Sequence, residues 1–310
     1  MCQTGPSELR AGPGQAPAGP RAEGQRTKQE KDGIPKGRLH RYAFLRAQNL
    51  KGRNDVTERI TSRQNPLAVQ IRKLNGSRSL RRETGLFVGE GPKLLEEALK
   101  AGWDVPTVVT AGECPLPLDP AVRHIEVPRE LLVNLCDTKT PQGVLFLARL
   151  PGLTAPEVLP GGRYLVLDGL QDPGNVGTIW RTADAFGADG LLLVNGCADP
   201  YAPKTVRATM GACFRLPVYE LAAEELPGLL ARSGLALYAT ALREDTVDLR
   251  RADLRRAAVV IGSEGRGVSQ ELLARSEKTV KIPMRPRCES LNAAAAAGVV
   301  LWEMAGRDLP

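Results

Sequence analysis

The chain has 310 residues, of which 42% are hydrophobic and 25% charged, a balance typical of a globular protein long enough for two domains. It contains no run of about 18 apolar residues that could span a bilayer, and its basic opening stretch lacks the apolar segment of a secretory signal. Composition therefore argues against a membrane or secreted protein and favours a cytoplasmic one.

Cysteine and histidine usage bears on redox state and metal binding. The six cysteines include no CxxC pair, and the only two histidines are His40 and His124. This pattern favours reduced thiols over disulfides or a zinc site, and it excludes a histidine-rich metal centre.

The net charge of +7 is unevenly distributed along the chain. Residues 1–100 hold 20 Lys and Arg against 10 Asp and Glu, whereas the remainder holds 22 against 25. A basic front can bind a polyanion such as RNA, because each cation that neutralises a phosphate releases a counterion. A solvated basic tail without a partner explains the charge equally well. The side chains expected to hold RNA phosphates are Arg72, Lys73, Arg78, Arg81 and Arg82.

In chain order, residues 1–55 combine AGPGQAPAGPRAEGQ with scattered charges, which predicts a disordered basic leader. Helical periodicity begins at Leu67, after Asn65 and Pro66, a suitable cap and first-turn pair. Downstream, GLFVGEG, PKLLEEALKAG and the runs VPTVV, RHIEV and GVLFLARL predict a small α/β domain over 56–150. Residues 151–162, rich in Pro and Gly, are predicted to be a linker.

Residues 163–310 are predicted to form a second α/β domain. Its strand-like runs are apolar throughout rather than alternating, which indicates burial on both faces and a mainly parallel sheet with helices on each side. These runs are RYLVLD, GLLLV, LPVYE, LALYAT, AAVVIG and KTVKIPM.

The first of three loops in this domain leads into a helix that turns Ile179, Ala183 and Phe186 to the core. Asn175 and Arg181 lie on its other side, just past the end of a strand, where open α/β sheets bind ligands. An arginine there suits a phosphate or a developing oxyanion. Taken alone, however, the pattern is better explained by helix capping through Asn175 and a surface ion pair of Arg181.

The second loop follows AAVVIG and reads GSEGRG from Gly262 to Gly267. Its three glycines let the backbone approach a ligand closely or adopt positive φ. The order GxxGxG near the end of the chain disfavours a nicotinamide cofactor, and the absence of GxxxxGK[ST] argues against nucleotide hydrolysis. In isolation this loop is most simply a tight turn.

The third loop follows KIPM and leads through Ser290, Leu291 and Asn292 into an alanine-rich helix. Ser290 is a suitable N-cap. Because five alanines over 293–297 leave little side chain on this helix, we expect it to pack very closely. That contact could belong to a dimer or to the core.

Together, and in this order, the three loops resemble the motif set of the SpoU, or TrmH, family of RNA ribose 2′-O-methyltransferases of the SPOUT class. The motifs are N-x-G-x-x-x-R-T-A from Asn175, G-x-E-G-x-G from Gly262, and I-P-M from Ile282 followed by S-L-N from Ser290. The segment ITSRQNPLAVQIRKLNGSRSLRRETGLFVGEGPKLLEEAL resembles the substrate-binding domain that many members carry in front. That match is looser, since members commonly read FLVEG where residues 87–91 read FVGEG.

The resemblance implies an α/β fold with a trefoil knot, a rare exception among protein folds, together with a homodimer, S-adenosylmethionine as cofactor and no metal. It also implies an RNA partner, with ribosomal RNA preferred over tRNA. The residues implied in catalysis are Asn175, Arg181, Ser290 and Asn292. Those implied in binding the methyl donor are Thr240, Gly262, Glu264, Ile282 and Leu291.

Methyl transfer from a sulfonium to a ribose hydroxyl depends chiefly on alignment of donor and acceptor. Because a guanidinium is a poor base, we expect Arg181 to act as an electrostatic clamp while the neutral side chains orient the ribose. Two other functions stay open. One is a non-catalytic RNA-binding or ribosome-assembly protein, against which the complete polar set argues. The other is an enzyme that methylates a tRNA base, which would need a different set of residues.

Overall fold

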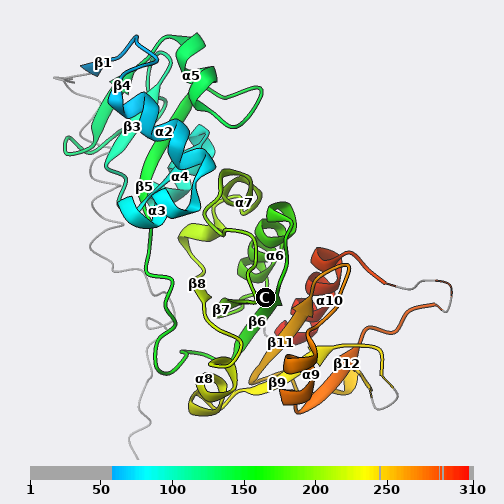
Figure 1. The fold of residues 1–310 in the computed structure, drawn as a ribbon. Helices are drawn as coiled ribbons and strands as arrows, with labels where there is room; N and C mark the ends of the chain where they lie inside the picture. The colour runs from blue at the N-terminus through cyan, green and yellow to red at the C-terminus, as the bar shows by residue number, and fades with distance from the viewer. Residues whose placement is uncertain (1–57, 244–245, 286, 288–289, 307–310) are drawn as a thin grey trace, which may run out of the picture. The chain divides into compact units, whose positions relative to one another are not determined.

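The computed structural model describes residues 58–243, 246–285, 287 and 290–306, and the predicted leader over 1–55 lies outside them. Within the described part of the chain the strands form two sheets, one of five strands and one of seven (Figure 1). Residues 151–162 connect the two sheets and contain neither helix nor strand. The domain boundaries placed at these positions stay a prediction.

The first sheet is mixed and has the order β1-β4-β3-β5-β2, with β5 antiparallel to both of its neighbours. Its strands are β1 (Glu58–Arg59), β2 (Leu86–Glu90), β3 (Thr107–Thr110), β4 (Arg123–Glu126) and β5 (Val144–Arg149). The helices of this region are α2 (Pro66–Gly76), α3 (Arg78–Thr84), α4 (Pro92–Lys100) and α5 (Arg129–Leu135). The predicted cap is confirmed, because the Asn65 side chain accepts a hydrogen bond from the Leu67 N–H. The short helices α3 and α5 were not predicted, since seven residues show little periodicity.

The second sheet is entirely parallel and has the order β10-β12-β9-β11-β6-β7-β8. Its strands are β6 (Arg163–Asp168), β7 (Gly190–Val194), β8 (Val218–Glu220), β9 (Ala236–Thr240), β10 (Val247–Asp248), β11 (Ala257–Gly262) and β12 (Lys278–Lys281). The helices are α6 (Pro173–Ala185), α7 (Pro203–Ala208), α8 (Leu226–Ser233), α9 (Gln270–Arg275) and α10 (Ala293–Ala305). The predicted parallel α/β class is therefore confirmed, and the trefoil knot stays a prediction.

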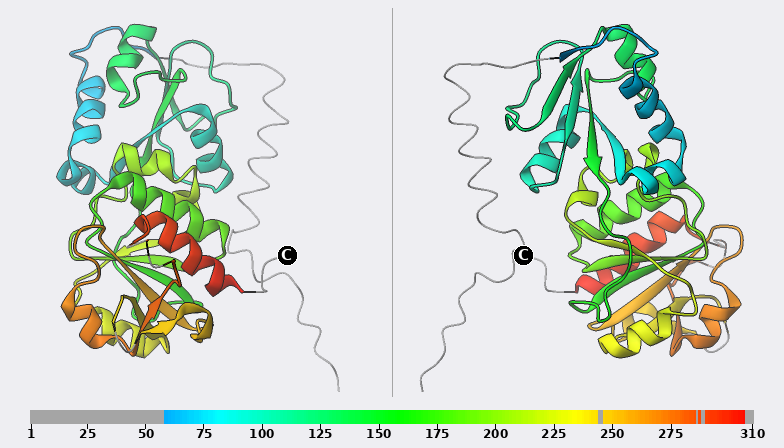
Figure 2. Two further views of the ribbon diagram at one scale, coloured as in Figure 1. Left: turned by 90° about the vertical axis from the view of Figure 1, so that its right-hand side faces the viewer. Right: turned by 60° about the vertical axis from the view of Figure 1, so that its left-hand side comes forward.

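Helices cover both faces of the parallel sheet. Residues of α6, α7 and α10 share one buried hydrophobic cluster with it, and residues of α8 and α9 belong to a second cluster on the other face. Figure 2 shows α6 and α10 side by side, with α8 and α9 across the sheet from them. The two helices are in contact, since a Cβ atom at Gly298 of α10 would lie at an ordinary van der Waals distance, 3.9 Å, from the Thr182 Cγ2 of α6.

The cluster that contains α6 and α10 also includes side chains of the five-stranded sheet. Phe87 of β2 packs on Tyr201 with ring centroids 4.7 Å apart, and Trp103 meets Phe214 edge-on at 5.3 Å. One of the three apolar clusters thus contains side chains from both sheets. Among the described residues, no helix is both long and apolar enough to cross a bilayer.

Candidate active site

The three loops singled out in the sequence leave the same edge of the parallel sheet. Gly262 at the end of β11 pairs in register with Asp168 at the end of β6, and Val280 of β12 pairs with Thr240 at the end of β9. Because all these strands run in one direction, the loops that follow them meet at their carboxyl ends. Residues more than 100 positions apart in the chain are thereby brought together.

A cavity of about 250 Å³ lies where these loops meet. Its walls are largely apolar and include Ile261 of β11 and Val280 of β12, the two strands that flank β9. All five residues predicted to bind the methyl donor line it, namely Thr240, Gly262, Glu264, Ile282 and Leu291. Ser290, predicted to be catalytic, lines it as well. A mostly apolar cavity with a few polar groups is typical of a small-molecule site.

The glycine loop is a tight turn and a wall of the cavity at once. Ser263 and Gly267 form an antiparallel bridge, and the Gly267 N–H donates to the Ser263 carbonyl at 2.8 Å. A Cβ atom at Gly262 would lie 2.1 Å from the carbonyl carbon of Gly267 and 2.2 Å from the nitrogen of Val268. Glycine is therefore needed at 262 because the protein's own loop folds back on it. The expectation that a ligand also approaches this glycine stays a prediction.

Three polar side chains form a hydrogen-bonded chain beside the cavity. The side-chain Oδ1 of Asn292 caps α10 by accepting from the Ala294 N–H at 2.9 Å, which leaves the Asn292 Nδ2 to donate to the Asn175 Oδ1 at 3.3 Å. The Asn175 Nδ2 in turn donates to Glu264. Since the cap fixes which end of Asn292 donates, the orientation of both amides follows from it.

The caps of the two helices differ from those considered in the sequence. Asp172, not Asn175, caps α6 and accepts from the Asn175 N–H at 2.9 Å. This contact and a hydrogen bond from Lys204 lower the pKa of the Asp172 carboxyl. Asn292, not Ser290, caps α10. Consequently the Asn175 side chain is free to bond across to the other two loops.

Arg181 is not part of this hydrogen-bonded chain. It lies on the exposed side of α6, while Ile179 and Ala183 of the same helix are fully buried, as predicted. Among the described residues, no hydrogen bond or ion pair involves its side chain, so the surface-pair explanation finds no partner there. The structure therefore joins Asn175, Glu264 and Asn292 and leaves Arg181 apart.

Sequence reasoning missed Asp168, whose buried carboxylate connects three of the loops at this sheet edge through hydrogen bonds. Its side chain is 4% exposed and accepts from the Asn195 Nδ2 at 2.7 Å and from the Ser269 N–H at 2.6 Å. It thus ties the loop after β6 to those after β7 and β11. An aspartate that ends an otherwise apolar strand, as in RYLVLD, was the available signal, since a buried carboxylate requires donors.

Among the residues that the structure describes, no group of histidine, cysteine or acidic side chains could hold a metal ion. The described cysteines are free, and burial raises the pKa of Cys213 to about 12 and that of Cys197 to about 11. A raised pKa keeps these thiols protonated at neutral pH.

Comparison with known families covers both parts of the chain. Residues 162–302 match the family model described as the SpoU rRNA Methylase family. Residues 65–146 match the model of the MRM3-like substrate binding domain. The first of these ranges contains all three loops that form the candidate site.

Curated relatives and solved structures agree with the family models. The chain is 30% identical over 251 residues to the 23S rRNA (guanosine(2553)-2′-O)-methyltransferase RlmP of Bacillus subtilis, which covers 80% of this chain and 100% of that protein. It is 32% identical over 268 residues to the 23S rRNA (uridine(2479)-2′-O)-methyltransferase of Streptomyces viridochromogenes, with coverage of 81% and 93%. The AdoMet-bound rRNA methyltransferase from Sinorhizobium meliloti matches with a TM-score of 0.72 and 33% identity, over 82% of this chain and 99% of that one.

Proposed function

The chain belongs to the SpoU family of RNA methylases, and we propose that it methylates a ribose 2′-hydroxyl of ribosomal RNA with S-adenosylmethionine. One observation carries this proposal, which is the meeting of three loops at one sheet edge. There a cavity of about 250 Å³ is lined by Glu264, which is bonded to Asn175. A donor cavity beside oriented polar groups is what transfer between two bound molecules needs.

The residues of the cavity fit S-adenosylmethionine. Ile261, Val280 and Leu291 offer apolar surface for an adenine ring, and the backbone of residues 240–242 and 262–264 offers polar groups for its edge. The carboxylate of Glu264 is suited to a cationic ligand. When bound, S-adenosylmethionine supplies an electrophilic methyl group on a sulfonium centre.

The chain of amides beside the cavity holds the acceptor ribose in place. Asn292 is fixed by its capping bonds, and it fixes Asn175 in turn. Ser290 lines the donor cavity two residues before that cap, so its hydroxyl is placed to contact the acceptor near the donor. These neutral groups orient the ribose but do not remove its proton, because none of them is a base at neutral pH.

Arg181 supplies the positive charge that the acceptor needs. Its exposed guanidinium has no partner among the described residues, so binding an oxyanion or a phosphate requires no existing ion pair to break. Charge placed where negative charge develops lowers the barrier to attack by the hydroxyl. Arg181 is therefore an electrostatic clamp on the acceptor.

The protein acts as a homodimer that associates through α10. Val299 and Trp302 are 41% and 59% exposed and lie one turn apart on this helix, which makes an apolar face. Phe186 of α6 contacts Trp302 at 5.7 Å between ring centroids, so α6 lies beside that face. Light scattering should give twice the chain mass, and Trp302→Glu should give a monomer. A wild-type monomer at micromolar concentration would refute the dimer.

Ribosomal RNA is favoured as substrate because two similar proteins are named as acting on 23S rRNA. The site of action is then wherever ribosomes are made, which in a bacterium is the cytoplasm. A tRNA ribose methyltransferase is the second candidate, and a non-catalytic assembly factor the third.

Ribose-methylation mapping of total RNA, from cells with and without the gene, tests the proposal directly. We expect one 2′-O-methyl group of large-subunit rRNA to be lost without the gene. Loss from a tRNA would support the second candidate. Titration of the purified chain with S-adenosylhomocysteine distinguishes a methyltransferase from the non-catalytic assembly factor, since an assembly factor has no need to bind the methyl donor.

A further inference from the structure

We propose that Arg78 and Arg82 of α3, together with Glu220 at the end of β8, form a binding site for one phosphodiester of the RNA backbone. This inference rests on the proposed function, because it takes RNA as the substrate. The proposed site is separate from the donor cavity, and it gives Glu220 the role of limiting the affinity for RNA.

The site is a cleft of about 540 Å³ between α3 and the carboxyl edge of the parallel sheet. Arg78 and Arg82 line one side, and Gly196, Cys197 and Glu220 line the other. Glu220 binds both arginines, at 2.9 Å from the Arg78 Nη2 and in a shorter contact with Arg82. Arg78 also donates to the Cys197 carbonyl at 3.5 Å.

Charge within the cleft is incompletely balanced. The two guanidinium groups and the one carboxylate are the charged side chains among its described lining residues, so a net charge of +1 remains. The arginine side chains are 42% and 44% exposed, whereas that of Glu220 is 18% exposed. A phosphodiester carries one negative charge and would balance the cleft. The planar fork of arginine matches its oxygens.

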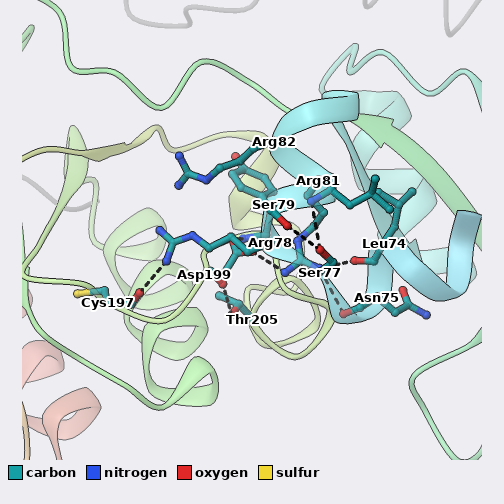
Figure 3. Close-up of polar contacts among 12 residues, drawn as sticks. Leu74, Asn75, Ser77, Arg78, Ser79, Arg81, Arg82, Cys197, Asp199 and Thr205 are labelled. Atoms are coloured by element: carbon teal, nitrogen blue, oxygen red, sulfur yellow. Dashed lines mark hydrogen bonds and ion pairs between the residues drawn. The ribbon is translucent and has the colours of Figure 1, made fainter.

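Arg81, on the same helix, has no such capacity. Figure 3 shows Arg78 and Arg82 extending the same way from α3, Arg78 toward Cys197, while Arg81 contacts Asp199 and residues at the end of α2. The Arg81 Nε and Nη2 donate to Asp199 at 3.0 and 2.5 Å, and its Nη1 donates to the Leu74 and Asn75 carbonyls. With every nitrogen engaged, Arg81 cannot bind a phosphate, and its predicted RNA contact is wrong.

The cleft adjoins the loop that carries the acceptor residues. Gly196 lines the cleft, and its carbonyl accepts from the Gln171 Nε2 at 2.8 Å. Gln171 is exposed and lies in the loop between β6 and α6, four residues before Asn175 in the first turn of α6. An RNA strand whose ribose lies at Asn175 would therefore continue along the same sheet edge, with a neighbouring phosphate at Arg78 and Arg82.

Glu220 has two opposing effects on such a ligand. It holds both guanidinium groups in the cleft before RNA arrives, which lowers the entropy lost on binding. It also repels an incoming phosphate and competes for the same donors. Because the arginines are already confined on one helix, we expect repulsion to dominate. Glu220 therefore limits RNA affinity, and its removal should tighten binding.

The test compares the full-length chain with the variants Arg78→Ala/Arg82→Ala and Glu220→Gln. A matched control, Lys100→Ala/Arg123→Ala, removes two cations from the same part of the chain that are also about half exposed, at 45% and 50%, and paired with carboxylates. The probe is a fluorescein-labelled 12-nucleotide polyuridylate, whose affinity is measured by anisotropy across a series of salt concentrations.

We expect the Arg78/Arg82 variant to bind about tenfold more weakly at low salt, with the slope of log K against log salt reduced by about 0.7 for one phosphate of a single strand. The control should keep the wild-type slope, and Glu220→Gln should bind about 3- to 10-fold more tightly. An unchanged slope, or equal losses in variant and control, would overturn the assignment. Should the double variant unfold, the direction of the Glu220→Gln change decides alone, since weaker or equal binding refutes the proposal.

Donor titration separates this proposal from the function on which it rests. A wild-type chain that binds no S-adenosylhomocysteine contradicts the methyltransferase function, while the salt slopes still report on the cleft. Conversely, the Arg78/Arg82 variant could transfer methyl groups normally and keep the wild-type slope of log K against log salt. That result would refute the phosphate site and leave the methyltransferase function untouched.

Discussion

Arg81 and Arg181 are the same residue type, both lie on helices, and both were expected from the sequence to contact RNA. In the structure Arg81 is 4% exposed and bonded through all three of its nitrogens, whereas Arg181 is exposed and has no partner among the described residues. A buried guanidinium is stable only with matching acceptors, and those acceptors then exclude a ligand. An arginine that binds substrate must therefore keep part of its guanidinium group accessible, as the side chains of Arg78 and Arg82 do at 42% and 44% exposure.

The first way to test this contrast is to remove the partner of Arg81. Asp199→Ala leaves a buried charge without its carboxylate, which should lower the apparent free energy of unfolding by about 3–5 kcal/mol. Urea denaturation followed by circular dichroism measures the change. Arg78→Ala is the control, since it removes a half-exposed ion pair and should cost about 1 kcal/mol or less. Equal losses in the two variants would contradict the structural role of Arg81.

The second test removes Arg181 itself. Arg181→Ala should lower the single-turnover rate of methyl transfer by about 100- to 1,000-fold, because one preorganised electrostatic contact is lost. Stability and donor affinity should stay near wild type, since the buried side of α6 is untouched and alanine favours helix. Lysine should rescue poorly, as it lacks the planar fork.

Arg275→Ala provides the control for that experiment. Arg275 is also an arginine on a helix, 38% exposed, but it is paired with Glu271. Its replacement should leave the rate unchanged. A near wild-type rate in Arg181→Ala would return Arg181 to the solvated surface and remove it from catalysis.

A third test concerns the glycine loop, where the fold itself demands glycine at 262. Gly262→Val forces a side chain against residues 267–268, and such overpacking costs about 1–3 kcal/mol. If this energy displaces the loop, the Kd for S-adenosylhomocysteine rises by about 5- to 150-fold. Gly265→Ala is the control, because no atom lies within 4 Å of its Cβ position. If calorimetry finds the same affinity for S-adenosylhomocysteine in Gly262→Val and wild type, this loop does not contribute to donor binding.

The smallest expected effect involves Cys197, two residues before Asp199. Its thiol donates to the Leu167 carbonyl at 3.1 Å, and burial raises its pKa to about 11. Iodoacetamide at pH 8 should therefore label it slowly in the wild type and faster in Asp199→Ala, as peptide mass spectrometry would show. Fast labelling of the wild type would show that Cys197 is accessible to the reagent, in contradiction to its burial in the structure.

The same thiol predicts a direction for the pH dependence of stability. The pKa of Cys197 is higher in the folded chain than in the unfolded one, where it lies near 9. The contribution of the buried thiol to the free energy of unfolding is therefore complete below about pH 9. It is lost as the pH rises toward about 11. Melting temperatures should thus fall across this range, and less steeply in Cys197→Ala.

Local sequence was sufficient for several features of the molecule. Continuous apolar runs predicted the parallel strands, and Asn65 with Pro66 predicted the start of α2, because both signals depend on neighbouring residues. The three ordered motifs predicted the family, and all five residues that the resemblance implied in donor binding line one cavity, although their role stays a prediction. Caps were harder to assign, since Asp172 and Asn292 each lie within three residues of another candidate.

What the sequence determined by itself was most of the longer elements, the parallel class of the second sheet and the family motifs that its loops carry. Only the tertiary structure decided which polar side chains are free. Asp199 lies 118 residues from Arg81, and Glu264 lies 89 residues from Asn175, so no local pattern pairs them. Strand register brings such residues together, and the acceptors found there decide whether an arginine supports the fold or stays available to RNA.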